Sequence, residues 1–157
     1  MQKINQKYIN NLVLKALEED LKPNGDITTK LLNSKNKIVQ AKIISKQNGI
    51  ISGINFCKAA FKLLERKSKF SQKIKDGKKV KRNQIIAEIT AKTKTILIAE
   101  RTALNFLNHA SGISTITNQY VSKVKNKTKI CCTRKTTPNL RLLEKYAVRT
   151  VSYTHLT

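Results

Sequence analysis

The 157-residue sequence has few acidic residues, few aromatic residues and no tryptophan. Nine Asp and Glu residues stand against 32 Lys and Arg, so the formal net charge is +23. Aromatic side chains make up only 5% of the chain and are not interleaved with the cations. A surface that stacks nucleic-acid bases needs such interleaving. We therefore expect no nucleic-acid partner, and we expect a core built from Ile and Leu.

Cysteines and long apolar runs are also scarce. The three cysteines, Cys57, Cys131 and Cys132, do not have the spacing of metal ligands. Their odd number, together with an N-terminus that lacks the apolar region of a secretory signal, predicts reduced thiols in the cytoplasm. The apolar runs are too short to span a bilayer. We expect a cytoplasmic protein without a membrane partner.

Arginine is rare among the cations, with 6 Arg against 26 Lys. This bias, with 18 Ile and 14 Asn, is typical of AT-rich coding sequence and accounts for much of the positive charge. Four of the six arginines lie after residue 100: Arg101, Arg134, Arg141 and Arg149. Because Lys cannot replace Arg where a carboxylate or phosphate is bound by two parallel hydrogen bonds, these positions favour an anion site.

The alternative class is a small basic nucleic-acid-binding module, which the net charge alone supports. The densest run of charge, residues 67–82, holds eight cations and a single acid, Asp76. We interpret this run as a solvated surface of strands and turns.

The spacing of apolar residues predicts a mixed α and β chain. Helices are expected from residue 4 to about 21, from 53 to about 64, from 100 to about 124, and after Pro138. Strands are expected at residues 38–45, 49–51, 70–74, 85–89, 95–99 and 129–132.

The last of these strands leads into two adjacent cations, Arg134 and Lys135. Arg offers a planar fork for a carboxylate, and Lys offers a point charge for a phosphate. A strand that ends in a basic turn is suited to an anionic substrate. The alternative interpretation is a solvated basic turn in a lysine-rich protein.

Several motifs, in order along the chain, resemble quinolinate phosphoribosyltransferase. The matching stretches are Glu19–Leu21, Gly25–Thr29, Glu100–Leu107, Ser111–Ile113, Thr133–Pro138 and Leu140–Arg149. The chain departs from the family at Asn139, where Gly is usual. Asn tolerates a left-handed backbone, so the departure changes little.

The resemblance implies an enzyme of NAD biosynthesis. It would make nicotinate mononucleotide, pyrophosphate and carbon dioxide from quinolinate and phosphoribosyl pyrophosphate, with Mg²⁺ as cofactor. Arg101 would bind quinolinate in the neighbouring protomer of a homodimer. Thr133 and Arg134 would bind quinolinate, and Lys135 would lie near the donor's phosphates. No catalytic residue and no metal ligand of the family falls within this sequence.

The resemblance also implies the fold class. Residues 1–110 would form an α+β domain with a barrel-sandwich-like sheet and helices. Residues 111–149 would form a linking helix and the first βα unit of an incomplete α/β barrel. We expect residues 150–157 to be a non-native tail, because their back-translation resembles a sequencing adapter, and we expect the chain alone to be inactive. A related phosphoribosyltransferase-like protein of molybdenum-transport operons is the alternative within this superfamily.

Overall fold

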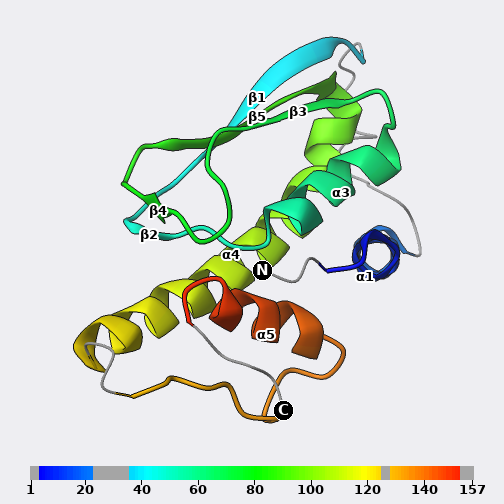
Figure 1. The fold of residues 1–157 in the computed structure, drawn as a ribbon. Coiled ribbons are helices and arrows are strands. Elements are labelled where there is room, and N and C mark those ends of the chain that lie inside the picture. Colours follow the sequence, from blue (N-terminus) through cyan, green and yellow to red (C-terminus); the bar gives the residue numbers. More distant parts are fainter. Residues whose placement is uncertain (1–3, 23–35, 125–127, 153–157) are drawn as a thin grey trace.

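The computed structural model describes residues 4–22, 36–124 and 128–152, so the motif at residues 25–29 lies outside the described part. Two small antiparallel sheets lie above a set of helices (Figure 1). In chain order the elements are α1 (Gln6–Leu21), β1 (Ile38–Ile44), β2 (Gly49–Ile50), α3 (Ile54–Leu64), β3 (Lys69–Gln72), β4 (Lys79–Val80), β5 (Ile85–Lys92), α4 (Thr93–Val124) and α5 (Arg141–Arg149). All four predicted helices are confirmed, as are the predicted strands between residues 38 and 89.

Strand β5 is the centre of the larger sheet, whose order is β1–β5–β3. Both neighbours run antiparallel to it, with Ala41 and Phe70 each paired with Ile89 from opposite sides. Ala87, Ile89 and Ala91 alternate along β5 and are buried, because successive side chains of a strand point to opposite faces. The sheet therefore has one face against the helices. Strands β2 and β4 form the second, two-stranded sheet.

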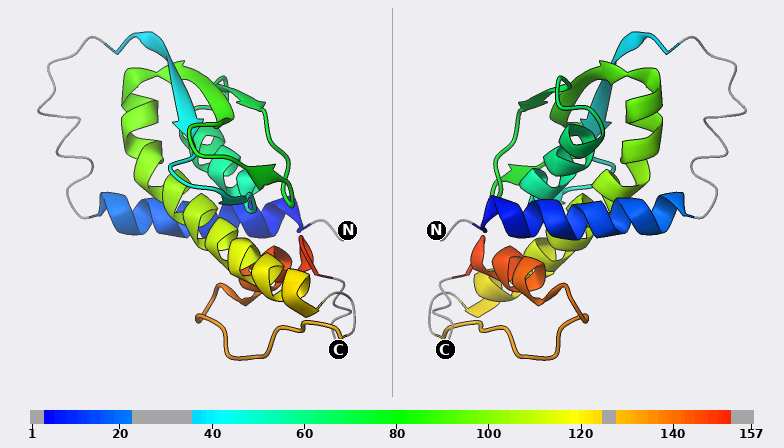
Figure 2. Two further views of the ribbon diagram at one scale, coloured as in Figure 1. Left: turned by 90° about the vertical axis from the view of Figure 1, so that its left-hand side faces the viewer. Right: turned by 90° about the vertical axis from the view of Figure 1, so that its right-hand side faces the viewer.

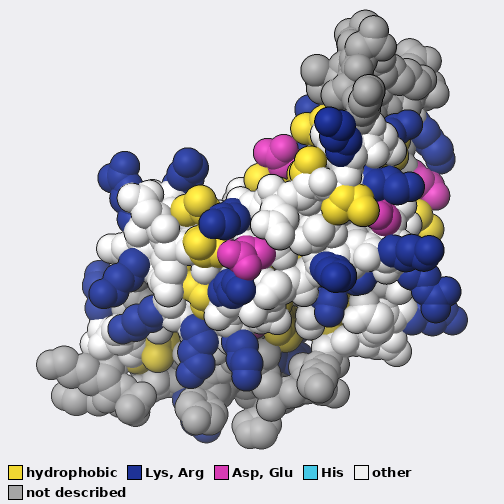
Figure 3. Space-filling view, turned by 90° about the horizontal axis from the view of Figure 1, so that it is seen from above, with side chains coloured by type: hydrophobic (Ala, Val, Ile, Leu, Met, Phe, Trp, Pro, Cys, Tyr) yellow, Lys and Arg dark blue, Asp and Glu magenta, His cyan; other side chains and the backbone are white. Residues whose placement is uncertain are grey.

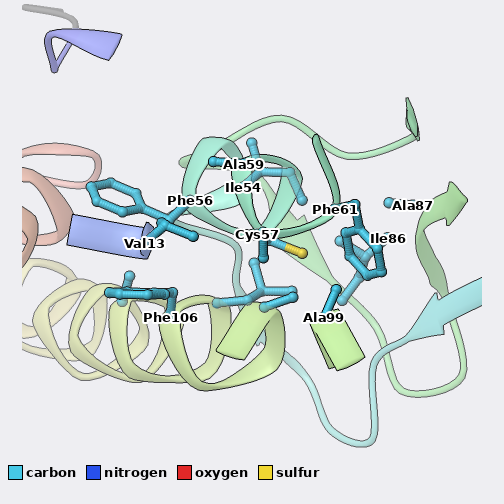
Figure 4. Close-up of a cluster of buried hydrophobic side chains, with 14 of the residues drawn as sticks. Val13, Ile54, Phe56, Cys57, Ala59, Phe61, Ile86, Ala87, Ala99 and Phe106 are labelled. Atoms are coloured by element: carbon cyan, nitrogen blue, oxygen red, sulfur yellow. The ribbon is translucent and has the colours of Figure 1, made fainter. Parts of the chain in front are cut away.

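Helix α3 lies at the centre of the core, packed against both α1 and α4. Phe56 of α3 stacks on Phe106 of α4 with ring centroids 5.5 Å apart (Figure 4).

Cys57, on the next position of α3, is fully buried. Burial, with the Asp76 carboxylate nearby, raises the pKa of its thiol to about 12. This cysteine is thus a small apolar core residue.

Helix α4 is longer than expected, because it begins at Thr93 and includes residues 95–99. The strand predicted at 95–99 is therefore wrong. Thr95 and Ala99 are buried one helical turn apart, whereas Leu97 between them is 38% exposed. A strand would place all three on one face, so this burial follows a helix. The helix continues without interruption through the predicted domain boundary at 110/111 (Figure 2). No helix of the described residues is long and apolar enough to cross a membrane.

The strand predicted at residues 129–132 is also wrong, since the described residues 128–140 contain no strand. A strand of a parallel barrel needs neighbouring strands for its backbone hydrogen bonds, and the described residues offer none here. Instead, the carbonyl of Ile130 accepts a hydrogen bond from the Ser152 hydroxyl at 2.8 Å. Helix α5 forms where expected. The α+β part of the predicted fold class is therefore observed, whereas the first βα unit lacks its strand.

Candidate anion-binding site

The predicted site residues Thr133, Arg134 and Lys135 lie between α4 and α5, in what we call the basic segment, residues 133–137. The Thr133 hydroxyl accepts a hydrogen bond from the Lys135 amide at 3.1 Å. The Thr136 amide donates to the Arg134 carbonyl at 3.0 Å. Arg134 and Lys135 are exposed, and neither side chain has a hydrogen-bond or ion-pair partner among the described residues. Both cations can therefore meet an anion without first breaking an internal contact.

Two side chains of α5 hold the basic segment in place. Glu144 accepts a hydrogen bond from the Thr137 amide at 3.2 Å and contacts the His109 ring at 2.9 Å. Arg141 donates from Nε to the Thr136 hydroxyl at 3.2 Å. Burial opposes ionisation of Glu144, but the hydrogen bonds from Thr137 and His109 outweigh it and hold the pKa of Glu144 below its ordinary value. Helix α5 and the basic segment thus form one unit.

Helix α5 is itself fixed to the rest of the protein. Leu143 and Ala147 are fully buried against α4. The Ser114 hydroxyl of α4 donates to the Ala147 carbonyl at 2.8 Å, and this bond is buried. Figure 2 shows α5 lying beneath α4, opposite the sheets. The basic segment is therefore carried by a helix that belongs to the core.

A cavity of about 450 Å³ lies beside the basic segment. Three cations of α5 line it at a spacing of four residues, which places them on one face of the helix. Thr136 and Thr137 line it from the basic segment. The cationic residues are Arg141, Lys145 and Arg149. In the sequence, Arg141 and Arg149 stand out only as rare arginines that favour an anion site, and the four-residue spacing of the three cations was the signal that could have shown this shared face.

Arg101, the fourth predicted site residue, lies elsewhere. It is on the exposed side of α4 and donates from Nη1 to Asp20 Oδ1 at 3.0 Å. Asp20 also lines a cleft of about 570 Å³ between α1, α4 and α5. Neither cavity described here is lined by Arg101 or by residues 133–135. The structure therefore brings Thr133, Arg134 and Lys135 together but leaves Arg101 at a separate place on the surface.

The described residues fit no metal ion. They contain no group of three or more His, Cys, Asp or Glu side chains placed to hold one. Magnesium therefore remains a prediction from the family resemblance.

Many other cations of the described residues are scattered over the face seen from above (Figure 3). Figure 3 shows Lys and Arg side chains across the whole face seen from above, with other polar and apolar side chains between them. A nucleic-acid interface would gather them in a patch or stripe. No such patch is seen among the described residues on this face (Figure 3).

The fold and the site together define a class: an α+β domain that presents paired, exposed cations suited to a small carboxylated or phosphorylated anion. The chain belongs to the quinolinate phosphoribosyl transferase family. Residues 26–111 match the N-terminal domain of that family, and residues 113–153 match its C-terminal domain. Helix α4 spans the junction between the two matches.

Relatives from bacteria and plants agree with this assignment. The chain is 37% identical over 145 residues to a probable nicotinate-nucleotide pyrophosphorylase (carboxylating) of Bacillus subtilis, covering 92% of this chain and 48% of the relative. It is 36% identical over 133 residues to quinolinate phosphoribosyltransferase (decarboxylating) 1b of Nicotiana tabacum, covering 85% of this chain and 38% of the relative.

Solved structures share the fold. The nicotinate-nucleotide pyrophosphorylase of Francisella tularensis superimposes with a TM-score of 0.88 at 36% identity, over 94% of this chain and 53% of that one. NadC of Streptococcus pyogenes superimposes with a TM-score of 0.91 at 33% identity, over 98% and 56%. The chain thus spans about half the length of the relatives that it matches.

Proposed function

We propose that this chain is the quinolinate-binding half of a phosphoribosyltransferase of NAD biosynthesis. The complete enzyme would transfer ribose phosphate from phosphoribosyl pyrophosphate to the ring nitrogen of quinolinate. Loss of one carboxylate would then leave nicotinate mononucleotide, pyrophosphate and carbon dioxide. Family membership and the exposed pair Arg134 and Lys135 support the proposal. The names of the relatives favour this activity over that of the molybdenum-operon protein.

The chemistry of the substrates agrees with the cations of the basic segment. Quinolinate carries two adjacent carboxylates, and a guanidinium binds a carboxylate through two parallel hydrogen bonds. Arg134 has no internal partner among the described residues, so binding of a carboxylate would cost no existing ion pair. Lys135 would place its charge near the phosphates of the sugar donor. Negative charge grows on the leaving pyrophosphate, so fixed cations stabilise the transition state.

We further propose that the enzyme is a cytoplasmic homodimer. Arg101 would serve the partner's site, which agrees with its position on the exposed side of α4, apart from the basic segment. Magnesium, which the family resemblance implies, would supply positive charge to the pyrophosphate of the donor.

A chimera tests the proposal. Residues 1–149 would be joined to the second half of the Bacillus subtilis relative, and formation of nicotinate mononucleotide would be measured. We expect turnover by the chimera and none by the 157-residue chain. Arg134→Ala should lower kcat/KM for quinolinate about 100-fold, since it removes charge-assisted hydrogen bonds to the substrate.

Lys129→Ala is the matched control, because Lys129 is an exposed cation on the same connection that lies outside the basic segment. We expect it to keep kcat/KM within about twofold. Equal losses in the two variants would mean that general positive charge, and not Arg134, binds quinolinate. That result would contradict the proposed role.

A further inference from the structure

Asp76 lies in the turn that follows β3, within the most basic run of the chain, yet its carboxylate points inward. Oδ2 accepts a hydrogen bond from the Gly53 amide at 3.0 Å, and Oδ1 accepts one from the Ile54 amide at 3.1 Å. These amides begin helix α3, where backbone N–H groups lack partners within the helix and an anion is favoured. Asp76 therefore caps α3 from a distant part of the chain.

The same carboxylate also reaches α5. Tyr146 donates its hydroxyl to Asp76 Oδ2 at 2.7 Å. Burial and the negative charge of Asp76 raise the pKa of Tyr146, so the phenol stays protonated and remains a donor. One carboxylate thus connects the start of α3 with the middle of α5.

The backbone around Asp76 is packed too closely to shift easily. The Gly77 amide donates to the Ile51 carbonyl at 2.7 Å. A Cβ added at Gly77 would come within 2.9 Å of the Thr150 carbonyl, directly after α5. A Cβ added at Gly53 would lie 3.0 Å from the Ala110 methyl group and 3.3 Å from the Phe106 carbonyl. The turn, α3, α4 and the end of α5 therefore meet at this point with little free space.

From these contacts we propose that Asp76, acting through Tyr146, is a positioning residue for the basic segment. The chain of contacts runs from Asp76 to Tyr146 in α5, and from Glu144 of the same helix to the Thr137 amide. Rotation or sliding of α5 would move Glu144 and Arg141, and with them the backbone that carries Arg134 and Lys135. The functional consequence, tighter quinolinate binding, rests on the proposed function. The positioning itself does not.

The test compares Tyr146→Phe with Tyr120→Phe in the full 157-residue chain. Tyr146→Phe removes only the hydroxyl group that donates a hydrogen bond to Asp76. Tyr120 is 57% exposed on α4 and no hydrogen bond of its hydroxyl is found among the described residues, so its substitution is the matched control. The first readout is amide hydrogen exchange at Thr136 and Thr137, measured by NMR, which needs no ligand.

We expect Tyr146→Phe to speed exchange at Thr136 and Thr137 about tenfold, the effect of losing one hydrogen bond to a charged group. Exchange at Ile89 and Ala91 of the central strand should stay within about twofold, because local opening leaves the sheet intact. Tyr120→Phe should change neither pair. A uniform acceleration at all four amides, or none at Thr136 and Thr137, would overturn the proposal.

Titration with quinolinate is the second readout. We expect Tyr146→Phe to weaken binding about threefold to tenfold, because the cations are less well ordered before binding. If the unsubstituted chain does not bind quinolinate, the proposed function fails while the exchange measurement still decides the positioning role.

Asp76→Ala removes both the contact with the start of α3 and the contact with Tyr146. It should speed exchange at Thr136 and Thr137 at least as much as Tyr146→Phe does, and a smaller effect would contradict the proposal.

Discussion

Asp20 and Arg101 join the last turn of α1 to α4 through a hydrogen-bonded ion pair of 3.0 Å. The two residues are separated by 81 positions in the sequence. The Arg101 side chain is 75% exposed, whereas that of Asp20 is 26% exposed. The pair therefore anchors a solvent-facing guanidinium to a more buried carboxylate, which agrees with the proposal that Arg101 serves a partner subunit.

Asp20→Asn should separate binding from stability. An ion pair this exposed contributes less than about 1 kcal/mol to the free energy of unfolding, so urea denaturation should change little. In the chimera, KM for quinolinate should rise about threefold to tenfold, because Arg101 loses the contact that orients it. Glu19→Gln changes the neighbouring acid, which lines the same cleft, and should leave KM unchanged. An equal rise in both variants would show that only the local charge matters.

Leu143→Ala should lower the free energy of unfolding by about 2–5 kcal/mol, because it opens a cavity in a fully packed site. Leu143 is 0% exposed, whereas its neighbour Leu142 is 39% exposed. Leu142→Ala should therefore change the free energy of unfolding by less than about 0.5 kcal/mol. Urea unfolding of both variants checks this. Similar values for the two would mean that α5 does not share the common core.

Two glycines should respond in opposite ways to substitution by Ala. Gly112 lies within α4, and a Cβ there would meet no atom within 4 Å outside the adjacent backbone of its own helix. Gly112→Ala should raise the free energy of unfolding by about 1 kcal/mol, since Gly costs a helix more backbone entropy than Ala. Gly77 has φ of +81° and lies against the Thr150 carbonyl. Gly77→Ala should lower the free energy of unfolding by about 1–3 kcal/mol. Destabilisation by Gly112→Ala would contradict the open space seen beside it.

Elements with a clear apolar period could be predicted from the sequence, because the pattern reports which face is buried. The faces of α3 and α5, carried by Phe56 and Ala60 and by Leu143 and Ala147, illustrate this. The strand prediction at residues 95–99 was wrong because these residues have the composition of a strand. The buried positions along the whole of α4 are instead spaced three to four residues apart, as in a helix. The strand at 129–132 could not be judged locally, since a parallel strand depends on partners elsewhere in a sheet.

The site was only partly predictable for a related reason. Arg134 and Lys135 are adjacent, so the sequence displays them together. Asp76 and Tyr146 are 70 positions apart, and nothing in either neighbourhood indicates their contact. The one available signal was that Asp76 is the only acid among eight cations in residues 67–82 and is followed by Gly. Long-range hydrogen bonds of this kind become visible only in the folded chain.

The pKa of Asp76 leads to a prediction for stability against pH. Burial raises the pKa of Asp76 above its ordinary 3.8, and the hydrogen bonds from Tyr146, Ile54 and Gly53 reduce but do not cancel that rise. The folded state therefore holds the proton more tightly than the unfolded state does. The stability that this proton contributes is fully present below pH 3.8 and is lost as the pH rises through the pKa of the folded state.

Asp76→Asn removes this titration, so the difference in free energy of unfolding between the unsubstituted chain and Asp76→Asn should fall as the pH rises. Hydrogen bonds lower the pKa of Glu65 and Glu88, which act in the opposite direction. Both residues are present in the two proteins, so their effects cancel in the difference. Urea unfolding between about pH 3 and pH 7 measures it. A difference that grows with pH would mean that the three hydrogen bonds outweigh burial, and that Asp76 is more stable in the folded state as a carboxylate.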